Sequence, residues 1–324
     1  MANTDDSDRR KALASPLTVD EFLPASTTVR VDIGARSHQG VVRSTNEDHY
    51  LVIQLGRQQE TLATSLPDSD LPRRFEEHGF LMLVADGIGT GGSASVASRV
   101  ALSTVAHLLL HFGQWNLRID PTIASEVLRR ARRLYSEVDE AVAKRREDMP
   151  ALGDIATALT AAYSAGDHLF VAHVGHSRAY LLRDGIFTRL TRDHTSSQYF
   201  ADTGRPIAVE RRGQDLAHIL TDAIGSRGSR PDVDIEHFRL ADGDCLLLCT
   251  NGLTDMVDDE SIAETLSLRR RASEQCRILV DLANQKGGRD NVTAIVAQYE
   301  VPRDERDAAS RSSAPPASRP DDEG

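Results

Sequence analysis

Short apolar or alternating segments recur along the chain, and Gly, Asp or Asn bounds most of them. Such segments predict β-strands, because an alternating run buries one face in a sheet and a continuous apolar run is buried on both faces. The Asp184-Gly185 pair between two of the segments predicts a hairpin turn. The predicted strands are 49–55, 80–85, 155–163, 168–174, 178–183, 186–190, 244–250 and 291–299.

Three longer segments predict helices. The first has apolar residues at helical spacing from Ser93 to His111. Asp120 and Pro121 then provide an N-cap and a first-turn proline for a second helix, which is predicted to end near Arg146. The third is a helical region over 259–286, which stops at a pair of glycines.

The order of these elements decides between fold classes. Strands occur in runs with adjacent hairpins, and the long helices are inserted between the runs. A parallel sheet would instead show regular alternation of strand and helix. The sequence therefore predicts an α+β fold, in which two antiparallel sheets are flanked by helices.

The chain has 324 residues, which is enough for one large domain or two ordinary ones. No linker-like break or repeat is visible within 29–301, so this range is predicted to form one domain. Residues 1–28 are charged with little periodicity, and residues 302–324 are rich in Pro, Ser, Arg and Asp. These compositions predict a flexible leader and a disordered tail.

Charge and cysteine content narrow the choice of partners and compartment. The 38 Lys and Arg residues face 49 Asp and Glu residues, a net charge of -11, which argues against nucleic acid and anionic membranes as partners. No apolar run has the length of a membrane span or the form of a signal sequence. Cys245, Cys249 and Cys276 show no CxxC spacing and are expected to be buried thiols of a cytoplasmic protein.

Polar residues stand at the ends of several predicted strands. The segment 80–92, FLMLVADGIGTGG, runs from a buried strand into Asp86-Gly87, and such a pair alone favours a plain turn. Other strand ends carry Arg43, Glu47, Asp48, Asn251 and Asp290. If these ends meet at one rim, their oxygens form a site for Mg²⁺ or Mn²⁺, which prefer oxygen ligands.

Seven motifs resemble those of the metal-dependent serine/threonine protein phosphatases of the type 2C (PPM) family, in the bacterial single-domain form, and they occur in the family's order. They are RSTNEDH (43–49), ADGIG (85–89), IATALTAAY (155–163), FVAHVGHSRAYLLRDG (170–185), LTRDHT (190–195), LLLCTNGLTDMV (246–257) and GRDNVTAIV (288–296). The resemblance covers roughly residues 30–299. It implies a four-layer α/β/β/α sandwich with a two-metal site at one edge.

The resemblance also implies the ligands of two Mn²⁺ or Mg²⁺ ions. Glu47, Asp86 and the carbonyl of Gly87 would hold one ion. Asp86 would bridge to the second ion, which Asp290 and Asn251 would complete.

Three further residues match family positions. Arg43 resembles the phosphate-binding arginine, whose planar guanidinium suits a bidentate grip on a phosphoryl group. Asp48 would act from behind the ligands by orienting a metal-bound water. Asp154 matches an acid that helps to hold a third, weaker metal ion.

These parts imply an activity and a class of partner. The resemblance implies hydrolysis of phosphoserine and phosphothreonine by a hydroxide that bridges the two metals. The substrates would be phosphorylated proteins, and the enzyme would oppose a serine/threonine kinase. The segment 195–217 is predicted to form a flap over the edge of the site.

Departures from the family pattern keep two alternatives open. Asn251 replaces the usual aspartate, and a neutral amide is a weaker ligand, so the sequence predicts a higher metal requirement. The first alternative is a pseudophosphatase that binds partners without turnover, and the second is a metal-dependent hydrolase of small phosphoesters.

His176 stands where relatives often have Asp, and we expect neighbouring backbone groups to satisfy the hydrogen bonds of its ring. Ile88 stands where some relatives carry a histidine.

Overall fold

The computed structural model describes residues 28–67, 71–89, 93–111, 117–204, 216, 218–227 and 230–302. Apart from Thr28 and Pro302, the predicted leader and tail therefore lie outside the described residues. Much of the predicted flap, at 205–215 and 217, lies outside them too.

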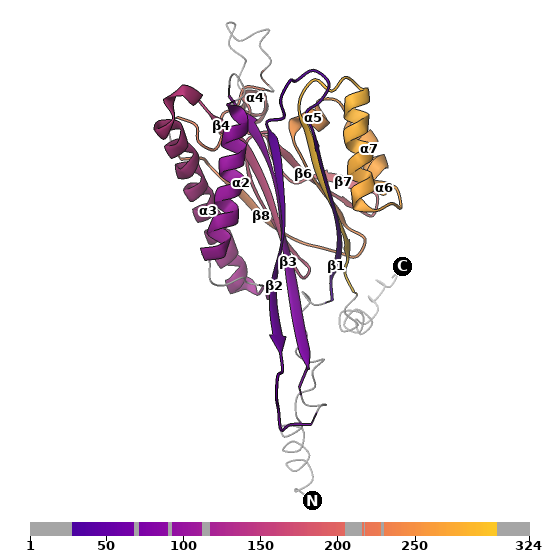
Figure 1. Cartoon of the computed structure of the whole chain (residues 1–324). Helices are drawn as coiled ribbons and strands as arrows, with labels where there is room; N and C mark the ends of the chain where they lie inside the picture. Colours follow the sequence, from indigo (N-terminus) through magenta and orange to yellow (C-terminus); the bar gives the residue numbers. More distant parts are fainter. Residues whose placement is uncertain are drawn as a thin grey trace, which may run out of the picture.

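Two five-stranded antiparallel sheets form the centre of the molecule (Figure 1). One sheet contains β1 (Arg30–His38), β6 (Arg178–Arg183), β7 (Ile186–Arg189), β9 (Cys245–Cys249) and β10 (Val292–Glu300), in the order β1-β10-β9-β6-β7. The other contains β2 (Asp48–Glu60), β3 (Arg74–Ile88), β4 (Ala156–Ala165), β5 (His168–Val174) and β8 (Asp234–Arg239), in the order β2-β3-β4-β5-β8.

Helices cover the outer face of each sheet. The helices α2 (Ala94–His111) and α3 (Pro121–Asp148) lie over the β2-β3-β4-β5-β8 sheet, and α6 (Asp259–Ser267) and α7 (Ala272–Gln285) lie over the other (Figure 1). The shorter elements are η3 (Pro150–Leu152), α4 (Ser196–Thr203) and α5 (Asn251–Thr254). This arrangement confirms the predicted four-layer α/β/β/α sandwich.

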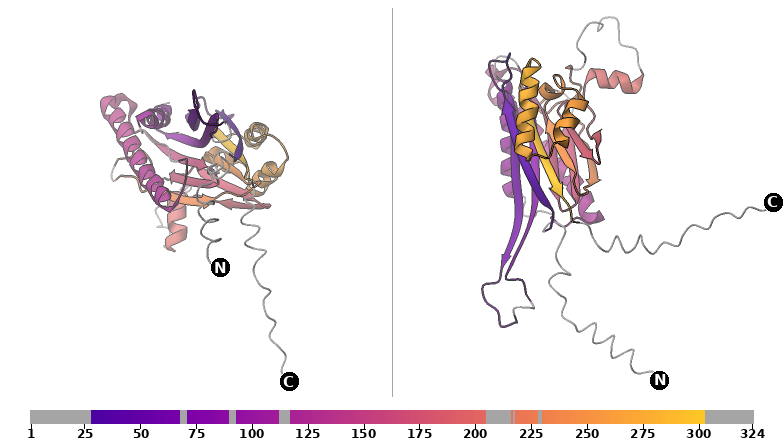
Figure 2. Two further views of the ribbon diagram at one scale, coloured as in Figure 1. Left: turned by 90° about the horizontal axis from the view of Figure 1, so that it is seen from below. Right: turned by 90° about the vertical axis from the view of Figure 1, so that its right-hand side faces the viewer.

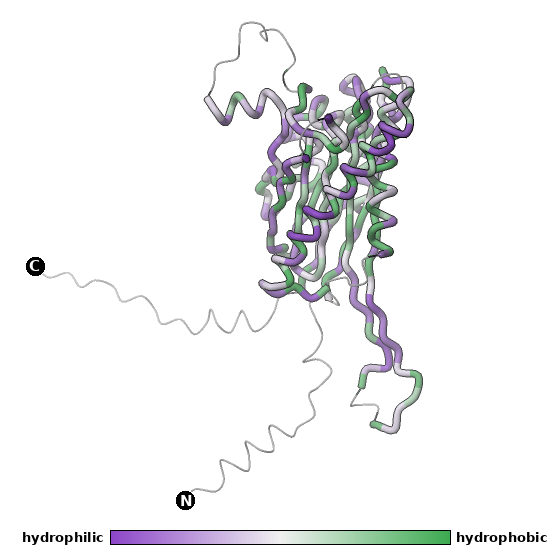
Figure 3. Tube along the Cα trace, turned by 90° about the vertical axis from the view of Figure 1, so that its left-hand side faces the viewer, coloured by the Kyte–Doolittle hydropathy of each residue, from purple (hydrophilic) through white to green (hydrophobic). Residues whose placement is uncertain are grey.

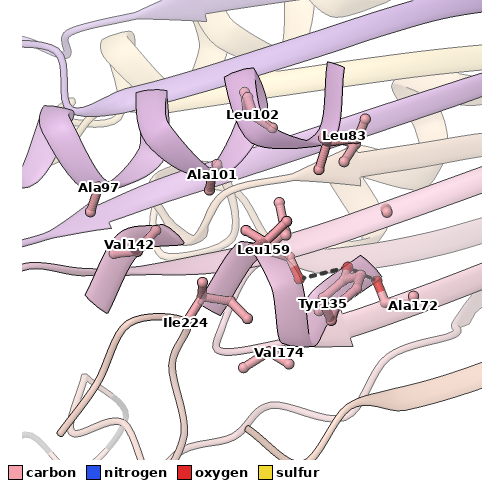
Figure 4. Packing of buried hydrophobic residues seen from close by; sticks show 14 of the residues in the cluster. Leu83, Ala97, Ala101, Leu102, Tyr135, Val142, Leu159, Ala172, Val174 and Ile224 are labelled. Atoms are coloured by element: carbon pink, nitrogen blue, oxygen red, sulfur yellow. Dashed lines mark hydrogen bonds between the residues drawn. The ribbon is translucent and has the colours of Figure 1, made fainter. Parts of the chain in front are cut away.

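Three apolar clusters separate the four layers. One lies between the two sheets and contains Val84 and Ile295, and a second lies under α6 and α7. The third lies under α2 and α3, where the buried Tyr135 hydroxyl contacts the carbonyl oxygens of Leu159 at 3.3 Å and Ala172 at 2.7 Å (Figure 4). These contacts satisfy the one polar atom of a ring that is otherwise packed among aliphatic side chains.

Most predicted elements are confirmed, including the N-cap, where the Asp120 side chain accepts from the N–H of Ile123. The prediction missed β1 and β8. Both are edge strands, and an edge strand such as β8 keeps much of its surface in water, so its apolar signal is weak. The predicted helical region 259–286 is two helices, with a break at 268–271.

The β2 and β3 strands are longer than predicted because part of each leaves the sandwich. Residues 56–60 pair with 74–78 and with no third strand, since β4 joins β3 only from Gly79. This two-stranded ribbon projects beyond the body of the molecule (Figure 2). Its strands are largely hydrophilic (Figure 3), so no apolar pattern marked them in the sequence.

Candidate active site

The polar strand ends from both sheets lie at one edge of the sandwich. Asp48 is the first residue of β2, and its register partner is Asp86 near the end of β3. Asn251 begins α5, with Thr250 between it and the end of β9, and Asp290 lies just before β10. Because β9 and β10 are neighbours, their ends bring Asn251 and Asp290 together.

Asn291 fixes the loop that carries Arg43 and Glu47. The residue is 5% exposed, and its Nδ2 donates to the carbonyl oxygens of Gln39 and Thr45 at 2.8 Å each. Its Oδ1 accepts from the N–H of Glu47, also at 2.8 Å. One amide therefore holds both ends of the loop. This role of Asn291 was not apparent from the sequence, although the residue lies in the GRDNVTAIV motif.

Two glycines permit backbone contacts that any side chain would prevent. A Cβ at Gly87 would collide with the carbonyl oxygen of Ala94, where α2 begins. A Cβ at Gly252 would collide with the carbonyl oxygen of Asn291. The glycine after Asp86 and the glycine after Asn251 are therefore required for the close approach of the segments that form the site.

A cavity of about 540 Å³ lies at this edge. The cavity is lined by the predicted phosphate-binding arginine, Arg43, and by five of the six predicted metal ligands. These five are Glu47, Asp86, Gly87, Asn251 and Asp290. The rest of the lining consists of Ile88, Gly89, His176, His218, Gly252, Asp255, Met256, Arg289 and Asn291.

Negative charge is concentrated in this cavity. The side chain of Asp86 is 16% exposed, and its burial, followed by the nearby charge of Asp290, raises its pKa to about 8. Burial also raises the pKa of Glu47. Arg43 offsets part of this charge, since its Nη2 donates to Oδ2 of Asp290 at 2.7 Å. A divalent cation would stabilise the ionised carboxylates further.

Asp48 is buried, with 4% of its surface exposed, and is not part of the cavity lining. Its Oδ2 accepts hydrogen bonds from the hydroxyl groups of Thr250 at 2.7 Å and Thr293 at 2.8 Å. Burial, followed by the charge of Asp86, raises the pKa of Asp48 well above its ordinary value. The two threonines, whose role was not apparent from the sequence, tie the start of β2 in one sheet to the residue after β9 and to β10 in the other.

The amide of Asn251 has a defined orientation. Its Nδ2 donates to Oδ2 of Asp255 at 3.2 Å and lies 3.4 Å from Nδ1 of His218. Because an ionised carboxylate only accepts hydrogen bonds, the nitrogen faces Asp255 and the oxygen is left as the possible ligand for a cation. Asp255 and His218 were missed as lining residues, although Asp255 belongs to the LLLCTNGLTDMV motif.

The surroundings of the His176 ring differ from those that the sequence predicted. Its Nδ1 lies 3.8 Å from Oδ2 of Asp86 and is a buried atom without a hydrogen-bond partner among the residues that the structure describes. The expectation that backbone groups satisfy this ring is therefore wrong for Nδ1. Burial lowers the pKa of His176 to about 4, so the ring is neutral at physiological pH.

Asp154 is not brought to the cavity. Its side chain is 72% exposed and accepts from Nε of Arg227 at 2.7 Å. Within the described ranges, no three side chains of the His, Cys, Asp and Glu types converge as the ligands of one ion do. The candidate ligands for a cation therefore include the backbone carbonyl of Gly87 and the amide of Asn251 beside the carboxylates, and all of these atoms are the hard oxygen donors that Mg²⁺ and Mn²⁺ prefer.

The fold and this oxygen-lined cavity define a class of protein, a four-layer sandwich with a candidate divalent-metal site at one edge. The sequence model of the protein phosphatase 2C family matches residues 58–285. The chain therefore belongs to the protein phosphatase 2C family, as the motifs predicted. The match leaves Glu47 and Asp290 outside its bounds, and longer alignments with individual relatives cover more of the chain.

Two curated relatives are bacterial serine/threonine phosphatases. PstP of Mycobacterium tuberculosis is 32% identical over 273 residues, which is 84% of this chain and 46% of PstP. Stp of Listeria monocytogenes is 30% identical over 229 residues, which is 71% of this chain and 88% of Stp. The chain thus spans about half the length of PstP and most of the length of Stp.

Solved structures agree with this assignment. The crystal structure of the M. tuberculosis phosphatase PstP has a TM-score of 0.64 at 30% identity, with 83% of this chain and 98% of that chain covered. The catalytic domain of PstP in complex with two manganese ions has a TM-score of 0.63 at 31% identity, with 84% and 99% covered. Across the described part of this chain, none of the helices combines the length and apolarity that crossing a bilayer requires.

Proposed function

We propose that this chain is a metal-dependent serine/threonine protein phosphatase, which hydrolyses phosphoserine and phosphothreonine in proteins. The observation that carries the proposal is the single acidic cavity into which distant segments bring Arg43, Glu47, Asp86, Asn251 and Asp290. An arginine among carboxylates combines a group that binds phosphoryl oxygens with ligands for a hard cation. The names of PstP and Stp describe the same activity for those relatives.

The lining fits Mn²⁺ or Mg²⁺ as cofactors. Glu47, Asp86 and the Gly87 carbonyl would hold one ion, and Asp290 and Asn251 would complete a second site that shares Asp86. Bound ions of this kind supply Lewis acidity toward a phosphoryl oxygen and lower the pKa of water. The two manganese ions in the PstP catalytic domain support a pair of ions here. A weaker third ion at Asp154 stays a prediction, because Arg227 pairs with this carboxylate outside the cavity.

Arg43 would bind the phosphoryl group of the substrate. Its side chain is 51% exposed and lines the cavity, so a substrate can reach it. Because its guanidinium now bonds Asp290, binding of a phosphoryl group would exchange a carboxylate partner for phosphoryl oxygens on the same planar group. The N–H groups of Val41 and Val42 both donate to the carbonyl oxygen of Gly288, which holds the backbone beside Arg43 in place.

Asp48 would act as a positioning residue. It is register partner of Asp86, and the two hydroxyl groups from Thr250 and Thr293 fix one of its oxygens. A buried carboxylate beside Asp86 influences both the orientation and the proton affinity of that ligand. Asp48 touches no open part of the cavity, so its contribution would pass through Asp86.

The substrates proposed here are phosphorylated proteins, and the enzyme would reverse the action of a serine/threonine kinase. We place this activity in the cytoplasm. The three cysteines support that compartment, because Cys245, Cys249 and Cys276 are buried free thiols and burial raises the pKa of each above its ordinary range.

The decisive test is Mn²⁺-dependent hydrolysis of p-nitrophenyl phosphate and of a phosphothreonine peptide. We expect Asp86→Ala and Asp290→Ala each to lower turnover by about 100-fold or more, since each removes a proposed ligand. Asp148→Ala is the matched control, because this aspartate ends α3 at an exposed position and should leave turnover unchanged.

The same assay separates the alternatives. No turnover across a wide range of Mn²⁺ and Mg²⁺ concentrations would reject the enzyme and leave the pseudophosphatase, for which the neutral Asn251 is the structural argument. Faster turnover of nucleotides or sugar phosphates than of phosphothreonine peptides would instead favour the hydrolase of small phosphoesters.

A further inference from the structure

A second cavity, of about 780 Å³, lies at the opposite end of the sheet from the candidate active site. Its walls are the start of β1, the start of β9, the end of β10 and the connection 268–271 between α6 and α7. The strands β9 and β10 each run from this cavity to the catalytic edge, so the two cavities share no lining residue. We call it the arginine cavity.

Four arginines line this cavity in a chain whose net charge is -11. Arg269, Arg270 and Arg271 are consecutive and exposed, and Arg30 stands at the start of β1. Arg270 pairs with Glu274 on α7. Among the described residues, the other three guanidinium groups have no carboxylate within ion-pair distance. These guanidinium groups give the wall of the cavity positive charge that an anion would offset.

The acids of the lining are mostly committed to other partners. Asp244 is fully buried and makes a two-point contact with Arg183. Asp32 accepts from the N–H of Ala272 and so caps the first turn of α7. Glu300, which is the register partner of Arg30, is exposed and is the remaining carboxylate of the lining. The N–H of Ala272 is neutral, so Asp32 keeps its negative charge. Arg30, Arg269 and Arg271 therefore outnumber the two lining carboxylates that pair with no other cation in the described part of the chain, Asp32 and Glu300.

The segment that carries the arginines has a fixed backbone. Gln275 is completely buried, and its Nε2 donates to the carbonyl oxygens of Leu266 at 2.8 Å and Leu268 at 2.9 Å. Gln298 donates to the carbonyl oxygen of Arg270 at 2.8 Å and to Oε1 of Gln275 at 2.8 Å. The two amides thus fix the carbonyl groups of Leu266, Leu268 and Arg270. A ligand would therefore not have to order this connection on binding.

We propose that the arginine cavity binds a small organic phosphate of nucleotide size. Planar guanidinium groups match phosphate oxygens in a bidentate manner and also stack on flat rings. Val31, Leu266 and Leu268 supply an apolar wall for the body of such a ligand. The volume lies in the range of sites for small molecules. The cavity uses no residue of the candidate active site, so this inference does not depend on the proposed function.

The test is calorimetric titration of the full chain in EDTA, with Arg43→Gln and Arg289→Gln in every variant to remove both arginines that line the catalytic cavity. The probes are AMP, ADP, inorganic phosphate and a phosphoserine peptide. We expect ADP to bind the chain that carries Arg43→Gln and Arg289→Gln. Adding Arg269→Gln or Arg271→Gln should weaken binding by about tenfold each, because each removes a charge-assisted contact. Circular dichroism and urea unfolding check that the variants are folded.

Arg132→Gln is the matched control, since Arg132 is an exposed arginine on α3 at the other side of the molecule. It should leave ADP binding unchanged. The proposal is overturned if ADP does not bind, if Arg132→Gln weakens binding as much as Arg269→Gln and Arg271→Gln, or if binding survives when Arg269→Gln and Arg271→Gln are combined. Arginine-dependent binding of inorganic phosphate alone, or of the phosphopeptide in preference to both nucleotides, would also overturn it and would identify the other source of the phosphate.

Discussion

Replacement of Asn291 by alanine tests whether one buried amide organises the catalytic edge. The substitution removes three hydrogen bonds of 2.8 Å, to the carbonyl oxygens of Gln39 and Thr45 and from the N–H of Glu47. Each such bond contributes about 0.5–1.5 kcal/mol net, so the loss in the free energy of unfolding should be about 3 kcal/mol. Gln39 and Thr45 are exposed and Glu47 is half-buried, so water can replace part of the lost bonding and the value should not exceed this midpoint.

The assay has a stability arm and a binding arm. Urea unfolding gives the free energy of unfolding, and calorimetric titration gives the affinity for Mn²⁺. Because Asn291 holds the loop that carries Glu47, the variant should also bind Mn²⁺ at least about tenfold more weakly. Asn291→Asp keeps the acceptor for Glu47 but replaces the donor to the two carbonyls with an oxygen, so it should be destabilised even though its shape is unchanged.

Asn284→Ala is the control for removing an asparagine near the same edge, because the buried Oδ1 of Asn284 has no hydrogen-bond partner among the described residues. This variant should lose less than about 1 kcal/mol. The reasoning would be refuted if Asn291→Ala were no less stable than Asn284→Ala, or if its affinity for Mn²⁺ equalled that of the wild type.

Three further predictions concern the carboxylates and their neighbours. Asn251→Asp should lower the Mn²⁺ concentration needed for half-maximal activity by about tenfold, because a charged ligand replaces an amide; unchanged activity and metal affinity would show that Asn251 is no ligand. The raised pKa of Asp86, about 8 against an ordinary 3.8, means that the folded protein binds more protons than the unfolded chain between these values. In EDTA, the stability gained by Asp86→Asn over wild type should therefore grow from pH 5 to pH 8, by at most about 1.4 kcal/mol per pH unit in urea unfolding, and a constant difference would contradict the assignment. Asp154→Ala breaks an exposed ion pair with Arg227 and should change stability by less than about 0.5 kcal/mol; a loss of activity confined to high Mn²⁺ would support a third ion at Asp154, and full activity at every concentration would reject it.

The projecting ribbon shows where hydrophobic patterns in the sequence do not predict the strands. Periodicity in a sequence records which apolar side chains are buried. Residues 56–60 are all exposed, and the buried residue among 74–78 is Glu77, a charged side chain, so the ribbon leaves no apolar pattern. The edge strand β8 was missed for a related reason. The break at 268–271 was also invisible, because it depends on Gln275 and Gln298 binding carbonyls of the connection from other elements.

Much of this protein is determined by local sequence. Apolar segments bounded by Gly, Asp and Asn define most of the strands, and the order of strands and helices defines the four-layer class. The motifs that contain Glu47, Asp86 and Asp290 identify the family and the candidate ligands, since each ligand sits next to a strand whose burial is encoded nearby.

Only the tertiary structure decides which of those residues meet. It brings Asp290 and Asn251 to the same cavity as Asp86, leaves Asp154 outside with Arg227, and buries Asp48 behind the lining. It also reveals Asn291, whose three partners lie some 250 residues away in sequence (Gln39, for example, by 252 positions). The physical reason is that strand ends are local features, whereas charge, hydrogen bonding and cavity shape at a shared edge depend on every segment that arrives there.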